Sequence, residues 1–187
     1  MSASVSFRAR VPSAIVGTTA ITTTETQFKD AASAALVSAA GAAAATATAC
    51  YVAMLAEKVD GQMMTLQIGG RVTGGGTTNV TLNICYGKAA AFASNTTIAT
   101  SGAVAVNSAN TNFGYIVRLM WDSTSLILQG VSGDGWMGTT PTIHTKAITT
   151  AQTAVAATTL LAFTVTCTYS ASFAGNAAYL TQFDLLV

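Results

Sequence analysis

A strict alternation of apolar and polar residues is the feature that most restricts how this chain can fold. In the segment TNFGYIVRLMW, Phe113, Tyr115, Val117, Leu119 and Trp121 occupy every second position. Side chains of a β-strand point alternately to the two faces of a sheet, so this spacing places all five on one face. The segment therefore predicts a strand with one buried face.

The same alternation appears in Val80–Tyr86 and Leu161–Tyr169, and these three segments are the strongest strand predictions. Weaker strand patterns, rich in threonine and valine, occur at Ser4–Arg10, Ala20–Thr26, Tyr51–Ala56, Met64–Thr73, Thr97–Ala99, Leu126–Val131 and Tyr179–Leu186. In the last of them, alternation places Tyr179, Phe183, Leu185 and Val187 on one side. Many short strands at this spacing predict an all-β chain, a jelly-roll-like two-sheet β-sandwich.

We expect residues 1–187 to form a single β-sandwich domain, because one core can accommodate a chain of this length. The alanine-rich N-terminal part has no apolar stripe that a helix could bury, so it is predicted to be irregular. Residues 1–50 are then an extended or loop-rich arm. The uncharged stretch Ala31–Ala56 is mostly alanine, serine and threonine, which is too weakly apolar to predict a membrane span.

Two glycine-rich segments separate predicted strands. Gly74–Gly76 lies in GRVTGGGTTNVTLNICYG, where neither a lysine nor a helix follows the glycines, as a phosphate-binding loop requires. It is therefore interpreted as a corner between two strands whose glycines adopt conformations that a Cβ would strain. The segment SGDG, Ser132–Gly135, is predicted to end the strand that begins at Leu126, with Asp134 as a turn residue.

Charge is unusually scarce, because only 8% of residues are Asp, Glu, Lys or Arg, against roughly 25% in an average soluble protein. The net charge is +1, and the basic residues are scattered singly apart from Arg8 and Arg10. No basic stripe is present, so nucleic acid is not expected as a partner. A surface so poor in charge is expected to be covered by copies of the same chain or by another protein.

The residues that usually carry chemistry form no recognisable constellation. His144 is the only histidine, and Cys50, Cys85 and Cys167 are widely spaced without a CxxC pair. The three cysteines are predicted to be buried free thiols rather than a disulfide framework or a zinc site. The seven acids stand near predicted turns or strand ends. We therefore expect no enzyme, no cofactor and no metal site.

The aromatic residues allow one binding hypothesis. Trp136, beside a predicted glycine turn, and Tyr115 are the candidates for a platform on which a sugar ring could stack, and core or interface packing is the competing interpretation. This hypothesis makes the chain a carbohydrate-binding or fibre-tip adhesion module of a virion.

The order of several segments resembles a group of tailed-bacteriophage virion proteins. They are GRVTGGGTTNVTLNICYG, then IATSGAVAV, TNFGYIVRLMW and LLAFTVTCTYSASFAGNAAYLTQFDLLV, so the resemblance covers roughly Gly69 to Val187. It is a pattern of turns and strands, not a catalytic signature. The group it resembles contains jelly-roll-like capsid decoration, or cement, proteins that act through their surfaces.

The resemblance implies a non-enzymatic protein that decorates and cements a capsid. Its expected partners are other copies of itself, as a homotrimer, and the major capsid protein. Its expected location is the capsid surface of a virion, after synthesis in the host bacterial cytoplasm. A tail-tube or baseplate protein is the remaining hypothesis, because such proteins share the β-rich, low-charge character.

Overall fold

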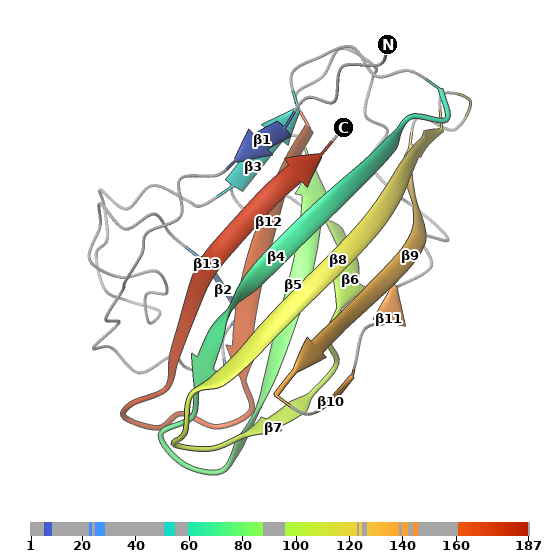
Figure 1. Cartoon of the computed structure of the whole chain (residues 1–187). Helices are drawn as coiled ribbons and strands as arrows, with labels where there is room; N and C mark the ends of the chain where they lie inside the picture. Colours follow the sequence, from blue (N-terminus) through green and yellow to red (C-terminus); the bar gives the residue numbers. More distant parts are fainter. Residues whose placement is uncertain are drawn as a thin grey trace.

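The computed structural model describes residues 6–8, 23, 25–28, 51–54, 60–87, 96–122, 124, 127–138, 140–141, 144–145 and 161–186. Within these ranges the chain forms two antiparallel β-sheets that face each other (Figure 1). The all-β, two-sheet sandwich predicted from the alternation is thus confirmed. The finer jelly-roll connectivity stays a prediction.

The first sheet has the strand order β1-β13-β4-β8-β9-β10. Its long strands lie at the front of Figure 1 and are β13 (Ala177–Leu186), β4 (Met63–Thr73), β8 (Thr111–Asp122) and β9 (Ile127–Met137), with β1 (Ser6–Arg8) and β10 (Thr140–Pro141) at the edges. The second sheet has the order β11-β6-β5-β12-β2, with β7 also paired to β5 and β3 to β12. Its strands are β11 (His144–Thr145), β6 (Thr96–Thr100), β5 (Thr78–Gly87), β12 (Leu161–Tyr169), β2 (Thr26–Gln27), β7 (Val104–Val106) and β3 (Tyr51–Met54).

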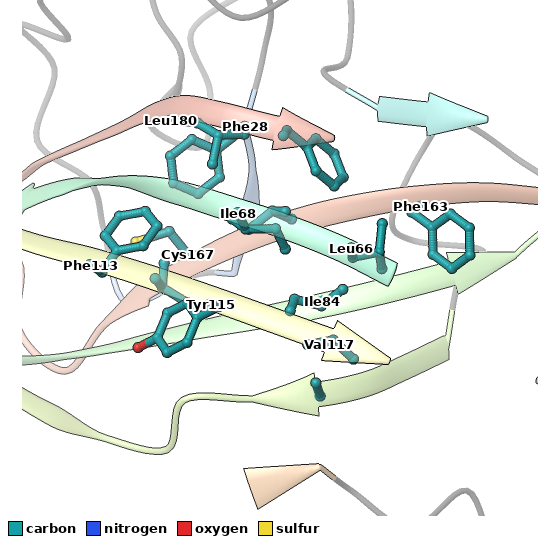
Figure 2. Close-up of a cluster of buried hydrophobic side chains, with 14 of the residues drawn as sticks. Phe28, Leu66, Ile68, Ile84, Phe113, Tyr115, Val117, Phe163, Cys167 and Leu180 are labelled. Carbon is teal, nitrogen blue, oxygen red and sulfur yellow. The ribbon is translucent and has the colours of Figure 1, made fainter. Parts of the chain in front are cut away.

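The core lies between the two sheets and is built from the alternating positions of the long strands. All five apolar residues of β8 that the alternation singled out are at most 3% exposed. They meet Leu66 and Ile68 of β4 and, from the second sheet, Ile84 and Phe163 (Figure 2). Phe28, after β2, is also fully buried and donates its backbone N–H to the carbonyl of Val165. Burial of one face of each strand therefore sets the register of both sheets.

Three aromatic rings in the first sheet pack over glycines of the neighbouring strand. A Cβ on Gly70 would lie 2.6 Å from the Phe113 ring, and one on Gly135 would lie 1.9 Å from the Tyr115 ring. These residues form the cross-strand pairs Gly70–Phe113 and Tyr115–Gly135. The third pair is Gly114–Trp136, on the outer face of the sheet. A glycine opposite an aromatic residue lets the ring lie flat on the backbone.

This packing corrects the interpretation of SGDG. The segment was expected to break the strand, but β9 runs through Ser132–Gly135 to Met137, and Asp134 is an exposed strand residue opposite Ile116. The glycines are in the strand because Tyr115 needs the space at Gly135, not because the chain turns. The turn itself lies earlier, where the Asp122 carboxylate accepts a hydrogen bond from the N–H of Thr124.

The corner at Gly74–Gly76 does join β4 to β5, as predicted, but its glycines serve a different purpose. None of the three has a left-handed φ. Instead, a Cβ on Gly75 would lie 2.2 Å from the carbonyl oxygen of Ala174. The requirement is therefore close approach to the loop between β12 and β13, not an unusual backbone conformation.

A register shift in β13 corrects the predicted side of Tyr179. Between Leu180 and Gln182 the pairing with β4 slips, so Leu180 and Phe183 are both buried. Tyr179 instead lies on the outer face, where the Arg71 guanidinium stands 4.4 Å from its ring centroid. Val187 lies outside the described residues, as does most of the strand predicted at Ala20–Thr26.

Tyr169 connects the two sheets. It ends β12 in the second sheet, and its hydroxyl lies 2.6 Å from the carbonyl oxygen of Ala177 and 3.0 Å from that of Thr73. Ala177 and Thr73 are paired residues of β13 and β4 in the first sheet. Burial raises the pKa of Tyr169 far above its usual value. The neutral hydroxyl thus acts as a hydrogen-bond donor across the sandwich.

Gly70→Ala is predicted to destabilise the fold by about 1–3 kcal/mol, since the new Cβ would meet the Tyr179 carbonyl oxygen at 2.0 Å. Gly69→Ala is the matched control, because its Cβ would make only ordinary contacts from 3.4 Å. Urea unfolding should show a lower midpoint for Gly70→Ala and a midpoint near wild type for Gly69→Ala. Equal shifts would contradict the packing described above.

Tyr169→Phe is predicted to cost about 1–2 kcal/mol, because it removes a buried hydrogen bond between the sheets. Tyr179→Phe serves as the control, since Tyr179 lies on the outer face and keeps its ring over Arg71. The free energies of unfolding of both variants, compared with wild type, test this. A Tyr169→Phe variant as stable as wild type would remove the inter-sheet role of the hydroxyl.

Candidate functional site

The outer face of the first sheet carries a groove of about 600 Å³. It crosses the four long strands β13, β4, β8 and β9. In the pairing register, Gln182, Gly69, Gly114 and Trp136 follow one another across these strands. The neighbouring row is Asp184, Gln67, Ile116 and Asp134. The groove is therefore lined by residues that are far apart in the sequence but share outward positions of the alternation. Asp184, at the end of the second row, is only 4% exposed and does not line the groove.

Two glycines form the floor of the groove. Gly69 of β4 and Gly114 of β8 are a cross-strand pair, so no side chain rises between Gln182 on one side and Trp136 on the other. The indole of Trp136 lies against Gly114, since a Cβ there would be 3.0 Å from the indole nitrogen. Trp136 is nevertheless 46% exposed. The result is a large aromatic ring held in place at the wall of an open groove.

Amide and carboxylate groups form the rim. The Gln182 side-chain nitrogen donates to the Gln67 oxygen at 3.2 Å and to the Asp184 carboxylate at 3.1 Å. On the opposite side, the Asp134 carboxylate lies 3.6 Å from the Arg118 guanidinium, which also donates to the Ser132 hydroxyl. Both members of this ion pair are largely exposed, so its contribution to stability is small.

Trp136 stands where the binding hypothesis requires it, but Tyr115 does not. Tyr115 is 3% exposed, points into the core and stacks on Phe113 with ring centroids 5.8 Å apart (Figure 2). Burial raises the pKa of its hydroxyl to about 12. The expectation that Tyr115 shares a stacking platform with Trp136 is thus corrected: consecutive positions on paired strands place the two rings on opposite faces of the sheet.

Trp121, Tyr86 and Tyr169 also lie in the core, because each is at most 2% exposed. The sequence analysis missed Gly69, Gly114, Gln67 and Gln182. The two glycines and Gln67 could have been found by marking the outward positions of the alternating strands. Gln182 could not, because the register shift in β13 interrupts its pattern.

The described cysteines are buried and free, as predicted. Cys85 of β5 and Cys167 of β12 make no disulfide, and Cys50 lies outside the described residues. The pKa of Cys85 is raised to about 11, chiefly by burial and also by the nearby Glu25 carboxylate, whereas hydrogen bonds with Thr97 and Thr166 lower it. Burial also raises the pKa of Cys167 well above its usual value. A nucleophilic cysteine needs the opposite shift.

The described acids include residues with structural partners and give no grouping that could hold a metal ion. Glu25 accepts hydrogen bonds from the Asn83 side-chain nitrogen and the Thr166 hydroxyl, which makes it a structural partner of the second sheet. No group of three or more His, Cys, Asp or Glu side chains within the described ranges could hold a metal ion. His144 is in β11, and its side chain is not among the described ones.

Comparison with known proteins identifies no relative. No family model matches the sequence, no curated protein matches it, and no solved structure matches the fold. The described residues include no apolar helix of a length that would span a membrane.

Cys85 and Cys167 are predicted to resist thiol reagents at pH 8 in the folded protein and to react fully in urea. Peptide mapping by mass spectrometry would follow each thiol separately. Because the pKa of Cys85 is about 11 in the folded state and lower when unfolded, the native state holds the proton more tightly. The protonated Cys85 thiol therefore contributes fully to the stability of the fold below about pH 9, and this contribution is lost as the pH rises through 11. Rapid labelling of folded Cys85 at pH 8 would contradict its burial.

Proposed function

We propose that this chain is a non-enzymatic structural protein of a tailed-phage virion, which decorates and cements the capsid through contacts with itself and with the major capsid protein. The turn-and-strand pattern from Gly69 to Val187 supports the proposal, as does the two-sheet β-sandwich that carries it. The jelly-roll topology, the homotrimer and the location on the capsid surface belong to this proposal. Free buried thiols suit synthesis in a reducing bacterial cytoplasm.

The observation that most supports the proposal is an exposed phenylalanine on a loop that hydrogen bonds hold in place. Phe173 is 37% exposed in the loop between β12 and β13, at the same end of the sandwich as the corner between β4 and β5 (Figure 1). An exposed aromatic residue on a rigid support is typical of an interface anchor, because little conformational entropy is lost on binding.

Hydrogen bonds from two sides hold this loop. The buried Asn176 side chain accepts from the N–H of Gly75 at 2.8 Å and donates to the carbonyl of Ala171 at 2.9 Å. The Ser170 hydroxyl accepts from the N–H of Asn79 and lies 3.1 Å from the Thr78 hydroxyl. The loop is thus fastened to the corner between β4 and β5. The Phe173 ring lies against Gly76, where a Cβ would be 3.2 Å from it, so the ring is held in position while 37% of the residue stays exposed.

The scarcity of charge also supports a protein whose surface is covered in an assembly. With 8% charged residues, the chain has little charge to keep a large surface in water, and an exposed aromatic residue adds to the advantage of covering it. In a symmetric assembly each such contact is repeated, so modest individual contacts add up to a stable lattice. A protein that binds only the assembled shell stabilises it by mass action.

The wild-type protein is predicted to form trimers in light scattering at high concentration, and virions lacking it to release their contents at a lower temperature than complete virions. Phe173→Ser should weaken self-association or shell binding by about 30-fold, as loss of an interface anchor does. Met63→Ser, a change at another exposed apolar residue, is the matched control and should have no such effect.

A monomer at high concentration, together with unchanged virion heat stability, would overturn the proposal. Ring-shaped or sixfold oligomers would favour the tail-tube or baseplate hypothesis instead. A Phe173→Ser protein that assembles and binds like wild type would show that the braced loop is not the contact.

A further inference from the structure

We propose that the groove between Trp136 and Gln182 is a binding site for a neutral oligosaccharide, with one sugar ring stacked on the indole of Trp136. This site lies on the outer face of the first sheet and does not include Phe173, so the inference goes beyond the structural role proposed above and is independent of it. Three features of the groove support it: its floor, its aromatic wall and its polar rim.

The floor is open although packing within the chain does not require it to be. Gly70 and Gly135 must be glycines, because a Cβ at either would collide with backbone or ring atoms. A Cβ at Gly69 would meet only the Gln182 side chain and the Phe113 carbonyl, from 3.4 Å outward, and Gly69 has no left-handed φ. Glycine in a strand is otherwise unfavourable, and it marks bulges and places where another backbone or a ligand approaches closely. The register shift of β13 lies opposite Gly69 and Gly70, and a ligand lying over Gly69 is the role proposed here.

The wall is an aromatic ring that is already in position. Trp136 rests on Gly114, and yet nearly half of the residue is exposed. A ring fixed by its own strand pair loses little freedom when a ligand stacks on it. Indole combines a large apolar face with a polar N–H, which suits a sugar ring that has an apolar C–H face and hydroxyl groups at its edge.

The rim matches hydroxyl groups rather than charge. The amides of Gln67 and Gln182 each contain a donor and an acceptor, and the Asp134 carboxylate accepts only. A sugar hydroxyl can donate and accept in the same way. The residues that line the groove include the Asp134 carboxylate and no basic side chain. Arg118, beyond Ile116, is engaged with Asp134 and Ser132, and Arg71, beyond Gly69, lies over the Tyr179 ring. A carboxylate without a cation in the lining favours a neutral saccharide over an acidic one.

The size of the groove agrees with a short oligosaccharide. Its volume of about 600 Å³ falls inside the range of roughly 300–1,000 Å³ that is usual for small-ligand sites. The groove crosses four strands, so a ligand could contact Trp136 at one end and Gln182 at the other. Small-ligand sites usually have a mostly apolar lining with a few polar groups, and the groove has this composition.

The test is an array of neutral and acidic oligosaccharides, followed by titration calorimetry with the best neutral one. Trp136→Ala should weaken binding at least tenfold, and Gly69→Val should abolish it by filling the floor. Because Gly69 has room for a Cβ, Gly69→Val is expected to stay folded, which its urea midpoint would verify. Met63→Ala changes an exposed residue of the same strand outside the groove and should bind like wild type.

A second readout uses the two tryptophans. Trp121 is fully buried, so fluorescence quenching by acrylamide reports mainly on Trp136, and a bound saccharide should reduce it. Phe173→Ser should bind the saccharide normally, which separates this site from the contact proposed for assembly. The inference is overturned if no neutral saccharide binds, if only acidic saccharides or peptides bind, or if a folded Gly69→Val protein binds like wild type.

Discussion

Packing of aromatic rings onto glycine backbone is the interaction on which the first sheet depends. Phe113 and Tyr115 of β8 each lie over a glycine of a neighbouring strand on the inner face, and Trp136 of β9 lies over Gly114 on the outer face. Each ring needs the absence of a Cβ opposite it, so the positions of aromatic residues and glycines are coupled across strands. On the outer face this coupling places Trp136 against Gly114, and Gly69, which no ring covers, completes the part of the groove floor that has no side chain.

Much of the fold could be predicted because alternation is a local signal. The alternating segments became β5, β8 and β12, since each must bury one face whatever its partners are. Alternation did not predict positions whose residue type is determined by contact with a strand that is distant in the sequence. Gly135 resembles a turn residue in sequence and lies inside β9 because it accommodates Tyr115. Likewise, nothing local distinguishes the register shift before Gln182, and Val104–Val106 is too short a strand to predict.

The candidate site was predictable only in part, for the same reason. Trp136 was selected because of its supposed turn, and it is exposed because β9 presents it outward. Tyr115 was predicted to line the core and also considered for a platform, although one side chain cannot do both. Its place in the alternation with Phe113 and Val117 was the better guide. The rim groups come from three different strands, and their meeting depends on strand order, which alternation does not encode.

The two sheets differ in what their outer faces can do. In the second sheet, some outward positions are closed: Thr164 and Thr166 of β12 are fully buried, and Cys85 of β5 is 2% exposed, whereas Thr81 and Thr168 stay partly exposed. Glu25 contributes to this by binding Thr166 and Asn83. In the first sheet, outward residues such as Ile116 and Trp136 remain accessible. The groove of the first sheet and the loop that carries Phe173 are separate surfaces. One is concave and polar at its rim, and the other is a partly exposed ring that packs against Gly76. The protein can therefore be held in an assembly at one and bind a ligand at the other.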